Sequence, residues 1–266
     1  MTRVVMFSGG AGSWAAAKRV AETYGSADLT LLFADTKTEH PDTYRFLHEA
    51  AANVGGSLVE IADGRNIWQV FHDERFLGNS RVDPCSRILK RELCDKYMAA
   101  NFDPADTTVY VGIDWSEEHR YRRLAARRLP WRYEAPLCDP PYLTKQQMHQ
   151  WAEREGLRKQ ELYLRGMPHA NCGGGCIKMG QGGFARLLQA APETFADWER
   201  NEQSLRDQLG DVSILKDRTG GSIKPLTLRS LRERLEAGQQ CDLFDIGGCG
   251  CFADDAAIEG AQEEQR

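Results

Sequence analysis

The sequence predicts an α/β protein with a doubly wound, mostly parallel five-stranded sheet, followed by a mainly helical, cysteine-bearing C-terminal region. Three observations predict this fold. A short apolar run at residues 4–7, VVMF, passes through a glycine-rich turn directly into an alanine-rich helical pattern. Further apolar runs then alternate with helical patterns at the spacing of a parallel sheet. Beyond about residue 156 the alternation fades and helical patterns dominate.

Composition places the chain among globular proteins. Its 266 residues, 41% of them hydrophobic, are enough for a substantial core. The net charge of −5 argues against a protein that coats nucleic acid, although it leaves local basic patches open. No apolar run approaches membrane-spanning length and the N-terminus enters a strand without a basic leader, so we expect a cytoplasmic protein with no membrane partner.

The expected elements follow in chain order from these patterns. We expect strands at residues 4–7, 29–34, 58–61, 108–113, 131–137 and 212–215. We expect helices from about residue 11 to 24 and at 41–52, 65–76, 84–99, 117–128, 145–155, 181–191, 193–209 and 227–237. The predicted organisation is a nucleotide-binding domain at 1–155, a helical region at 156–253, and an acidic, disordered tail at 254–266.

The first turn, Ser8-Gly9-Gly10-Ala11-Gly12-Ser13, has the composition of an anion cradle. Glycines let the backbone approach a ligand closely, and a helix N-terminus offers unpaired N–H groups with a partial positive charge. Many α/β proteins use such a turn only for packing, so the spacing alone leaves both interpretations open.

This turn resembles the SGGxDS pyrophosphate loop of the adenine nucleotide alpha-hydrolase-like (PP-loop) superfamily, which includes ATP pyrophosphatases, tRNA-thiolating enzymes and phosphoadenosine-phosphosulfate (PAPS) reductases. Gly12 stands where the family usually has Asp. The resemblance implies that the backbone and the hydroxyls of Ser8 and Ser13 bind the phosphates of an adenine nucleotide.

A second stretch, FADTKTEHP at residues 33–41, resembles the Asp-Thr and Glu-x-Pro-x-Thr-Tyr signature of the PAPS reductase family. In that family the strand end lies beside the adenosine, which would make Ala34 and Asp35 nucleotide-binding residues. The alternative is that Asp35 only caps a turn and that Pro41 only starts a helix.

A third stretch, Val111-Gly112-Ile113-Asp114, occupies the place where the family closes its adenosine pocket. Gly112 would let the backbone approach the base or ribose closely. Asp114 is a candidate for catalysis or metal binding. Five arginines follow within residues 120–128. Of these, Arg120 and Arg123 are the candidates for phosphate or sulfate contacts. The others form a solvated face or guide a polyanion such as tRNA or DNA.

The cysteines indicate metal or redox chemistry, because eight are many for a cytosolic chain. Cys85 and Lys90 resemble the family's Cys-x-x-x-x-Lys segment and are predicted to be catalytic. A helix start beside cations would stabilise the Cys85 thiolate. We interpret Cys94 as a core residue, and Cys138 and Cys241 as structural.

Two glycine-rich cysteine pairs complete the predicted site. Cys172 and Cys176 enclose three glycines, and Cys249 and Cys251 flank Gly250. With Cys85, these pairs can supply the four thiolates of a 4Fe–4S cluster. In the superfamily that this chain resembles, several members carry such clusters beside the pyrophosphate loop. The predicted ligands are Cys85, Cys172, Cys176 and Cys249, with Cys251 as the substitute. A zinc site, a reversible dithiol or unligated cysteines remain as alternatives.

Three functions follow from these resemblances. The first is an enzyme that binds ATP with Mg²⁺ held by Asp35 or Asp114, adenylates an acceptor such as tRNA or DNA, and transfers sulfur from a donor protein through the cluster. The second is a PAPS or APS (sulfonucleotide) reductase that uses a thiol donor, although the chain lacks the terminal Glu-Cys-Gly-x-x-Cys motif of those reductases. The third is a non-catalytic nucleotide-binding protein with Gly12 in place of Asp.

Overall fold

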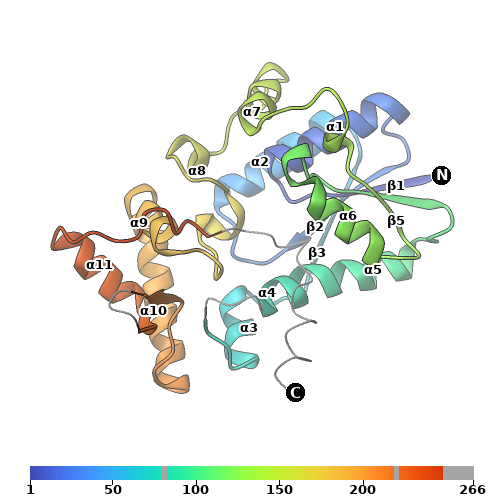
Figure 1. Ribbon diagram of the computed structural model, residues 1–266. Helices are drawn as coiled ribbons and strands as arrows, with labels where there is room; N and C mark the ends of the chain where they lie inside the picture. Colours follow the sequence, from blue (N-terminus) through green and yellow to red (C-terminus); the bar gives the residue numbers. More distant parts are fainter. Residues whose placement is uncertain (79–82, 219–221, 248–266) are drawn as a thin grey trace.

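The computed structural model describes residues 1–78, 83–218 and 222–247, and its centre is a parallel sheet (Figure 1). The strand order is β3-β2-β1-β4-β5, and every pairing in it is parallel. The strands are β1 (Thr2–Met6), β2 (Leu29–Asp35), β3 (Ser57–Ala62), β4 (Thr107–Tyr110) and β5 (Arg132–Glu134). The predicted doubly wound, five-stranded sheet is therefore confirmed.

This strand order creates one switch point, between β1 and β4. From β1 the chain winds outward through β2 to β3 and then returns to place β4 on the other side of β1. The segments that follow β1 and β4 consequently run to opposite faces of the sheet and leave a crevice at the carboxyl ends of the strands.

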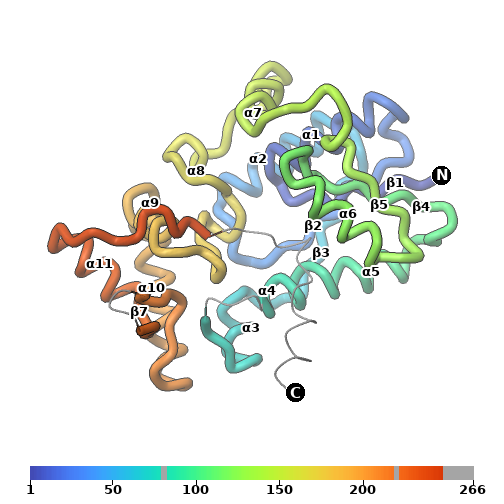
Figure 2. Tube along the Cα trace, viewed as in Figure 1, coloured from blue at the N-terminus to red at the C-terminus, as the bar shows by residue number. Residues whose placement is uncertain are grey.

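Helices cover the sheet on both faces, as the ribbon and the tube views show (Figures 1 and 2). On one face α1 and α2 pack over the central strands, and α7 packs against α1. On the other face α5 and α6 cover a second apolar cluster. These helices are α1 (Ala11–Tyr24), α2 (Pro41–Val54), α5 (Leu93–Asn101), α6 (Glu118–Arg127) and α7 (Lys145–Arg154).

The predicted helix at residues 84–99 is interrupted by a π-helical turn. It begins as α4 (Pro84–Ser86), continues as η1 (Arg87–Glu92) and ends as α5. Single π-helical turns inside helices are frequent at functional sites. Here the turn carries Lys90 and Arg91, which ion pair with different acidic residues, Glu39 and Asp83.

The C-terminal helices gather to one side of the sheet around a core of their own (Figure 1). This core also contains Ile67, Val70 and Phe71 of α3 (Ile67–Asp73). The other helices there are α8 (Glu161–Leu164), α9 (Gln181–Ala190), α10 (Pro192–Leu209) and α11 (Leu228–Glu236). The proposed division near residue 155 stays a prediction.

The strand predicted at residues 212–215 begins later than expected. The structure has a hairpin of β6 (Leu215–Asp217) and β7 (Lys224–Leu226) instead. The buried Glu202 carboxylate accepts hydrogen bonds from Ile214 N at 2.9 Å and Leu228 N at 2.6 Å. Because the Ile214 amide is bound to Glu202, it cannot donate to a strand ladder. No helix in the described residues is long and apolar enough to cross a membrane.

The pH dependence of stability is expected to involve His149 of α7, whose ring lies 4.6 Å from that of Tyr163 between centroids. Burial, together with Lys159, lowers the pKa of His149 to about 4. The group therefore contributes stability that is complete above its unfolded pKa of about 6.5 and is lost as the pH falls toward 4. Between pH 7 and 4.5, we expect the melting temperature of the His149→Phe variant to fall less than that of the wild type. The exposed His48, substituted in the same way, is the control, and equal pH dependence in all three proteins would contradict the assignment.

Candidate functional site

A cavity of about 230 Å³ lies at the carboxyl ends of β1, β2 and β4, at the switch point of the sheet. We call it the nucleotide cavity. Six of the residues predicted from the sequence line it: Ser8, Ser13, Ala34, Lys90, Gly112 and Arg120. Residues from four separate stretches of sequence thus converge on one crevice, as expected for a ligand site in an open α/β sheet.

The loop at residues 8–13 is held by its own hydroxyl groups. The Ser13 Oγ donates to Gly10 O at 2.9 Å and accepts from Gly10 N at 3.2 Å, and the Ser8 Oγ donates to the Ser13 Oγ at 3.3 Å. Gly9 has φ of 71°, a left-handed conformation that favours glycine. The loop therefore places two hydroxyls and the N-terminus of α1 at the cavity.

The end of β4 approaches this loop backbone to backbone. A Cβ atom on Gly112 would lie 2.8 Å from Ser13 N, a distance that side-chain carbons do not reach. A Cβ on Gly12 would lie 3.3 Å from Gly112 O, which is tight but can be relieved by a small shift. Gly12, which stands where the pyrophosphate loop that this turn resembles has Asp, therefore lies where the segment after β4 packs against the loop.

A buried amide from the C-terminal half also holds the loop. The Gln160 Nε2 donates to Gly9 O at 3.2 Å and to the Thr43 Oγ1 at 3.3 Å, and Gln160 is only 2% exposed. Sequence reasoning missed this residue, because no local motif connects it to a loop 151 positions earlier.

Asp35 is used within its own turn rather than in the nucleotide cavity. Its Oδ1 accepts from Tyr44 Oη at 2.7 Å and from Lys37 N at 2.8 Å, and its Oδ2 pairs with Lys37 Nζ at 2.8 Å. Burial raises the pKa of Asp35, but the bonds from Lys37 and Tyr44 outweigh it and lower the pKa overall. The neighbouring Ala34 is the residue of this strand end that lines the cavity.

Asp114 and the arginines of α6 take different positions. The Asp114 Oδ1 accepts from Ser116 N at 2.9 Å and caps η2 (Trp115–Glu117). Arg120 lines the cavity and ion pairs with Glu117, a cavity residue that the sequence reasoning did not select. Arg123 is exposed and does not line the cavity.

Glu39 links the nucleotide cavity to the cysteine-rich segment. Its carboxylate accepts from Cys172 N at 2.6 Å and from the Thr36 Oγ1 at 3.2 Å, and it lies 3.6 Å from Lys90 Nζ. Only 1% of the Glu39 side chain is exposed. A buried carboxylate requires such partners, since removing it from water is costly. In the sequence, Glu39 stands out only as part of a motif, and no separate role was predicted for it.

The segment at residues 171–176, which we call the cysteine knot, borders the cavity through its first residue. It begins with η4 (Asn171–Gly174), and Asn171 lines the cavity. Cys172 has φ of 52°, a left-handed conformation that its backbone bond to Glu39 helps to hold. A Cβ on Gly175 would lie 2.2 Å from the Trp198 Nε1, so this glycine lets the knot pack on α10.

The predicted cluster ligands are only partly described. Cys172 and Cys176 are buried, and Cys85 packs at the edge of the apolar core that contains Cys176. Within residues 1–78, 83–218 and 222–247 no three potential ligands come together to hold a metal ion. Cys249 and Cys251 lie outside the described residues. The backbone at Gly247, two positions before Cys249, pairs with Met179 beside the knot.

The sheet order and the loop after β1 define the fold. A parallel sheet of this order with a glycine-rich loop after β1 is the adenine nucleotide alpha-hydrolase-like (PP-loop) fold, as the sequence motifs predicted.

Solved structures of several proteins are similar to this chain. One is the PAPS reductase of Candida auris in a phosphate complex, with 13% identity and a TM-score of 0.45 over 64% of this chain and 81% of that one. The NH3-dependent NAD synthetase of Campylobacter jejuni has 13% identity and a TM-score of 0.40 over 91% of this chain and 88% of that one. NMN synthetase of Francisella tularensis has 13% identity and a TM-score of 0.44 over 92% and 80%. No protein-family model and no curated protein matches the sequence.

The backbone contact at Gly112 gives a graded test. We expect Gly112→Ala to destabilise the fold by about 2–3 kcal/mol, because the added carbon must push the loop aside. Gly12→Ala should cost less, about 1 kcal/mol, since its neighbour needs to yield only slightly. Gly78→Ala is the control, because a Cβ there would meet nothing within 4 Å. Urea denaturation measures all three, and a Gly112→Ala protein as stable as the control would contradict the close approach.

Proposed function

We propose that this chain is a nucleotide-binding enzyme that cleaves ATP to pyrophosphate and adenylates an acceptor, to which sulfur is then transferred. The observation that carries the proposal is the convergence of the loop hydroxyls, Lys90 and Arg120 on one cavity at the switch point. An anionic ligand with an aromatic base suits this lining, because Met6, Leu32 and Val111 supply apolar walls beside the cations.

The proposed reaction uses orientation and charge neutralisation. The acceptor attacks the α-phosphorus, the bond from that phosphorus to the bridging oxygen breaks, and pyrophosphate leaves with the electron pair. Backbone N–H groups of the loop and the start of α1 would hold the pyrophosphate. Lys90 and Arg120 would stabilise the charge that develops on it. Mg²⁺ would further neutralise the phosphates. Asp114, whose Oδ1 caps η2, is the candidate carboxylate to hold it, since both Asp35 oxygens are bound to Lys37 and Tyr44.

A 4Fe–4S cluster on Cys85, Cys172, Cys176 and Cys249, or Cys251 in its place, is part of the proposal. It is supported by Asn171, which begins the cysteine knot and lines the cavity, and by the backbone pairing of Met179 with Gly247. When bound, such a cluster would hold sulfide from the sulfur donor next to the activated acceptor, where the sulfur attacks the adenylated carbon and AMP leaves with the electron pair of the broken carbon–oxygen bond.

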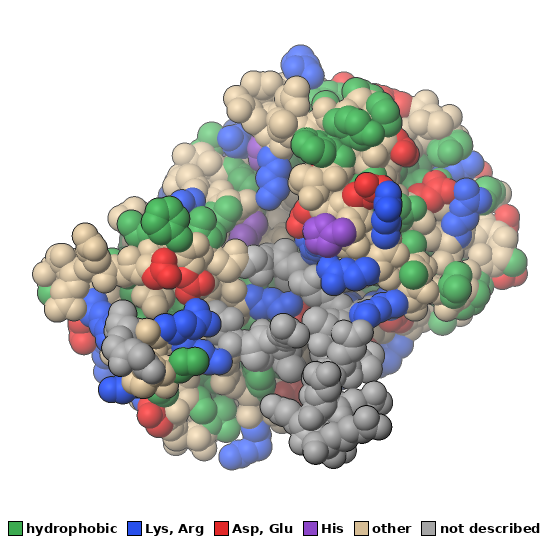
Figure 3. All heavy atoms as spheres, viewed as in Figure 1, with side chains coloured by type: hydrophobic (Ala, Val, Ile, Leu, Met, Phe, Trp, Pro, Cys, Tyr) green, Lys and Arg blue, Asp and Glu red, His purple; other side chains and the backbone are tan. Residues whose placement is uncertain are grey.

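A nucleic-acid acceptor is supported by the basic side chains around α6. Figure 3 shows Lys and Arg side chains over the face on which this helix lies. Arg123 is exposed, and Arg122, with 73% of its side chain exposed, pairs with Glu118 at 2.9 Å. Exposed cations of this kind bind phosphate backbones without selecting sequence.

Two arginines of α6 give a matched test of the nucleotide cavity. Arg120→Ala should weaken ATP binding about tenfold or more, because a charge-assisted hydrogen bond is worth about 1.5–3 kcal/mol. Arg123→Ala should leave ATP binding unchanged, since this side chain lies outside the cavity. Calorimetric titration with ATP measures both. Equal losses in the two variants would place the nucleotide elsewhere.

Product analysis separates this function from its alternatives. Pyrophosphate released from ATP in the presence of tRNA or DNA supports adenylation, and Lys90→Ala should reduce its rate. Sulfite released from PAPS or APS with a thiol donor would instead identify a sulfonucleotide reductase. Tight ATP binding without either product would identify a non-catalytic nucleotide-binding protein.

The cluster is tested by anaerobic purification with iron and sulfide analysis. We expect about four iron atoms per chain and absorbance near 400 nm, as is typical of iron–sulfur clusters. Cys172→Ser should lower the iron content, whereas Cys138→Ser should not, because Cys138 lies in a different part of the fold. A colourless wild-type protein without iron would remove the cluster from the proposal.

A further inference from the structure

Gln160 reaches the loop at residues 8–13 from a segment that follows α7 in the sequence. It lies directly before α8, where residues 158–161 run beside the first turn of α2 (Figure 1). The Gln160 side chain does not line the nucleotide cavity. It acts instead on the backbone of the loop, so any effect on a bound ligand must pass through the loop.

The peptide between Gly9 and Gly10 is held from two sides. The Gln160 Nε2 donates to Gly9 O at 3.2 Å, and Gly10 N donates to the Ser13 Oγ at 3.2 Å. In a trans peptide this carbonyl and this N–H point in opposite directions, so the two bonds together fix the rotation of the peptide plane. Gly9 has φ of 71°, and glycine passes easily between such conformations and others. The orientation of the plane therefore depends on both bonds.

The orientation of this peptide determines how α1 begins. Gly10 is the N-cap of α1, and its carbonyl accepts the first helical bond, from Trp14 N at 3.0 Å. The N–H groups at residues 11–13 have no partner within the helix and are the donors that can bind an anion. Their direction follows from the peptide directly before them. Gln160 thus acts, through one carbonyl group, on the donors that would meet a phosphate.

The segment that carries Gln160 is anchored to the start of α2. The Asp42 Oδ2 accepts from Glu161 N at 2.7 Å, and its Oδ1 pairs with Arg158 at 3.2 Å. Arg45 binds the same carboxylate and also donates to Arg158 O at 3.1 Å. The hydrogen bond from Arg45 lowers the pKa of Asp42, so this carboxylate is charged at neutral pH. The backbone on both sides of Gln160 is consequently fixed.

The chemistry of Gln160 indicates a role in bonding rather than in packing. The residue is only 2% exposed, and its Oε1 is buried without a hydrogen-bond partner among the residues that the structure describes. A buried acceptor without a partner costs stability. Methionine, which is also long and unbranched, would fill the same space without that cost. The amide is therefore suited to what its Nε2 does, which is to donate to Gly9 O and to the Thr43 Oγ1.

We propose that Gln160 is a positioning residue for the phosphate half of the nucleotide. By holding the Gly9–Gly10 peptide, it directs the N–H groups at the start of α1 toward the phosphates that leave as pyrophosphate. This inference rests on the proposed binding of ATP, but not on adenylation or on the cluster. In that binding mode the nucleoside lies against the strand ends at Ala34 and Gly112 rather than on this peptide. Gln160 therefore affects the affinity for phosphates and not the affinity for the nucleoside.

The test compares ATP and inorganic pyrophosphate with adenosine in calorimetric titrations. Gln160→Met removes the donor with little change of shape. It should weaken the binding of ATP and of pyrophosphate about tenfold, because the buried Gly9 O loses its partner and the peptide plane is released. Adenosine should bind as it does to the wild type. Gln150→Met is the control, because Gln150 is an exposed glutamine of α7 that does not line the cavity.

Thr43 provides a second pair of variants that leaves Gln160 in place. Its Oγ1 accepts from the Gln160 Nε2, and its side chain is 1% exposed. Thr43→Val keeps the shape but removes the hydroxyl, and it should weaken ATP binding about threefold without changing adenosine binding. Thr43→Ser restores the hydroxyl and should restore the affinity for ATP.

The outcomes separate the role of Gln160 from the proposed function. Equal losses of ATP and adenosine binding in Gln160→Met would show a general structural role and overturn the inference. Unchanged binding of ATP and pyrophosphate in that variant would overturn it as well, while the proposed function would stand. A wild-type protein that binds neither ATP nor pyrophosphate would overturn both. If the wild type binds ATP but releases no pyrophosphate, adenylation alone is removed, and a selective loss in Gln160→Met still supports the positioning role.

Discussion

The contact between the backbone at Gly112 and the backbone of Gly12 and Ser13 is the constraint on which the nucleotide cavity depends. It brings the end of β4 against the loop after β1 at the one place where the sheet reverses its winding. Any side chain at Gly112 would separate the two segments. With the separation fixed by backbone atoms, the Ser13 hydroxyl and the start of α1 face the same crevice as the strand ends. The position of the site is thus set by main-chain packing rather than by side-chain bonds.

Buried charges connect this crevice to the cysteine knot. Glu39 is bound at once to Lys90 of the cavity and to the backbone of Cys172. Asp83 is similarly placed between Arg91 and Lys178, at 3.0 and 3.1 Å. Ion pairs of this kind add little net stability, because desolvation offsets their attraction, but they tolerate few alternative arrangements. They therefore fix the register of the π-helical turn and of the knot against the β2–α2 turn, so the cavity and the knot act as one structural unit.

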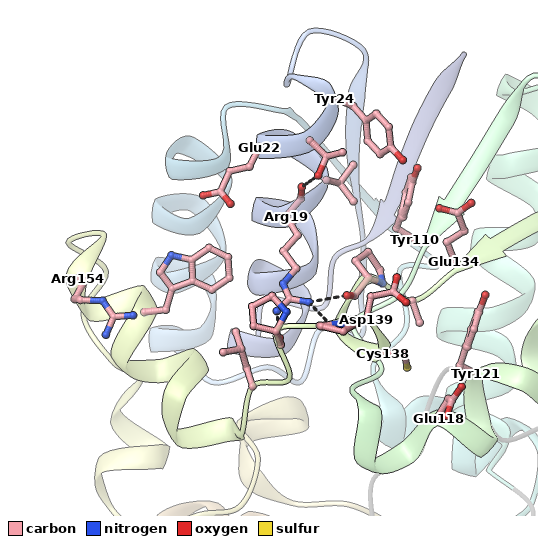
Figure 4. Close-up of a pocket in the computed structure, with 18 residues that line it drawn as sticks. Arg19, Glu22, Tyr24, Tyr110, Glu118, Tyr121, Glu134, Cys138, Asp139 and Arg154 are labelled. Atoms are coloured by element: carbon pink, nitrogen blue, oxygen red, sulfur yellow. Dashed lines mark hydrogen bonds between the residues drawn. The ribbon is translucent and has the colours of Figure 1, made fainter.

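The sequence predicted the fold well because its signals are local. Alternating strands and helices, the loop after β1 and the Asp35 turn can each be recognised within about ten consecutive residues. The site was predicted in part. Ser8, Lys90 and Gly112 lie in motifs, whereas Gln160 and Glu39 act through contacts with residues more than a hundred positions away. The cleft of about 840 Å³ beside α1 (Figure 4) was missed for a related reason, because its lining comes from separate stretches of the chain.

With Gly12, this loop offers different functional groups from a loop that carries Asp at the same position. A glycine supplies only its N–H and admits the close approach of Gly112 O. The loop then offers hydroxyls and amides, which bind phosphates but lack the negative charge with which a carboxylate attracts a metal ion or accepts a proton. Among the residues that the structure describes, the one carboxylate that lines the cavity is Glu117, and it is ion paired with Arg120. Negative groups for metal binding or proton transfer must therefore come from outside the loop, with Asp114 nearest in sequence to the β4 contact. The proposed binding of a nucleotide therefore rests on the loop itself, whereas the proposed turnover would depend on charged groups supplied by the elements around it.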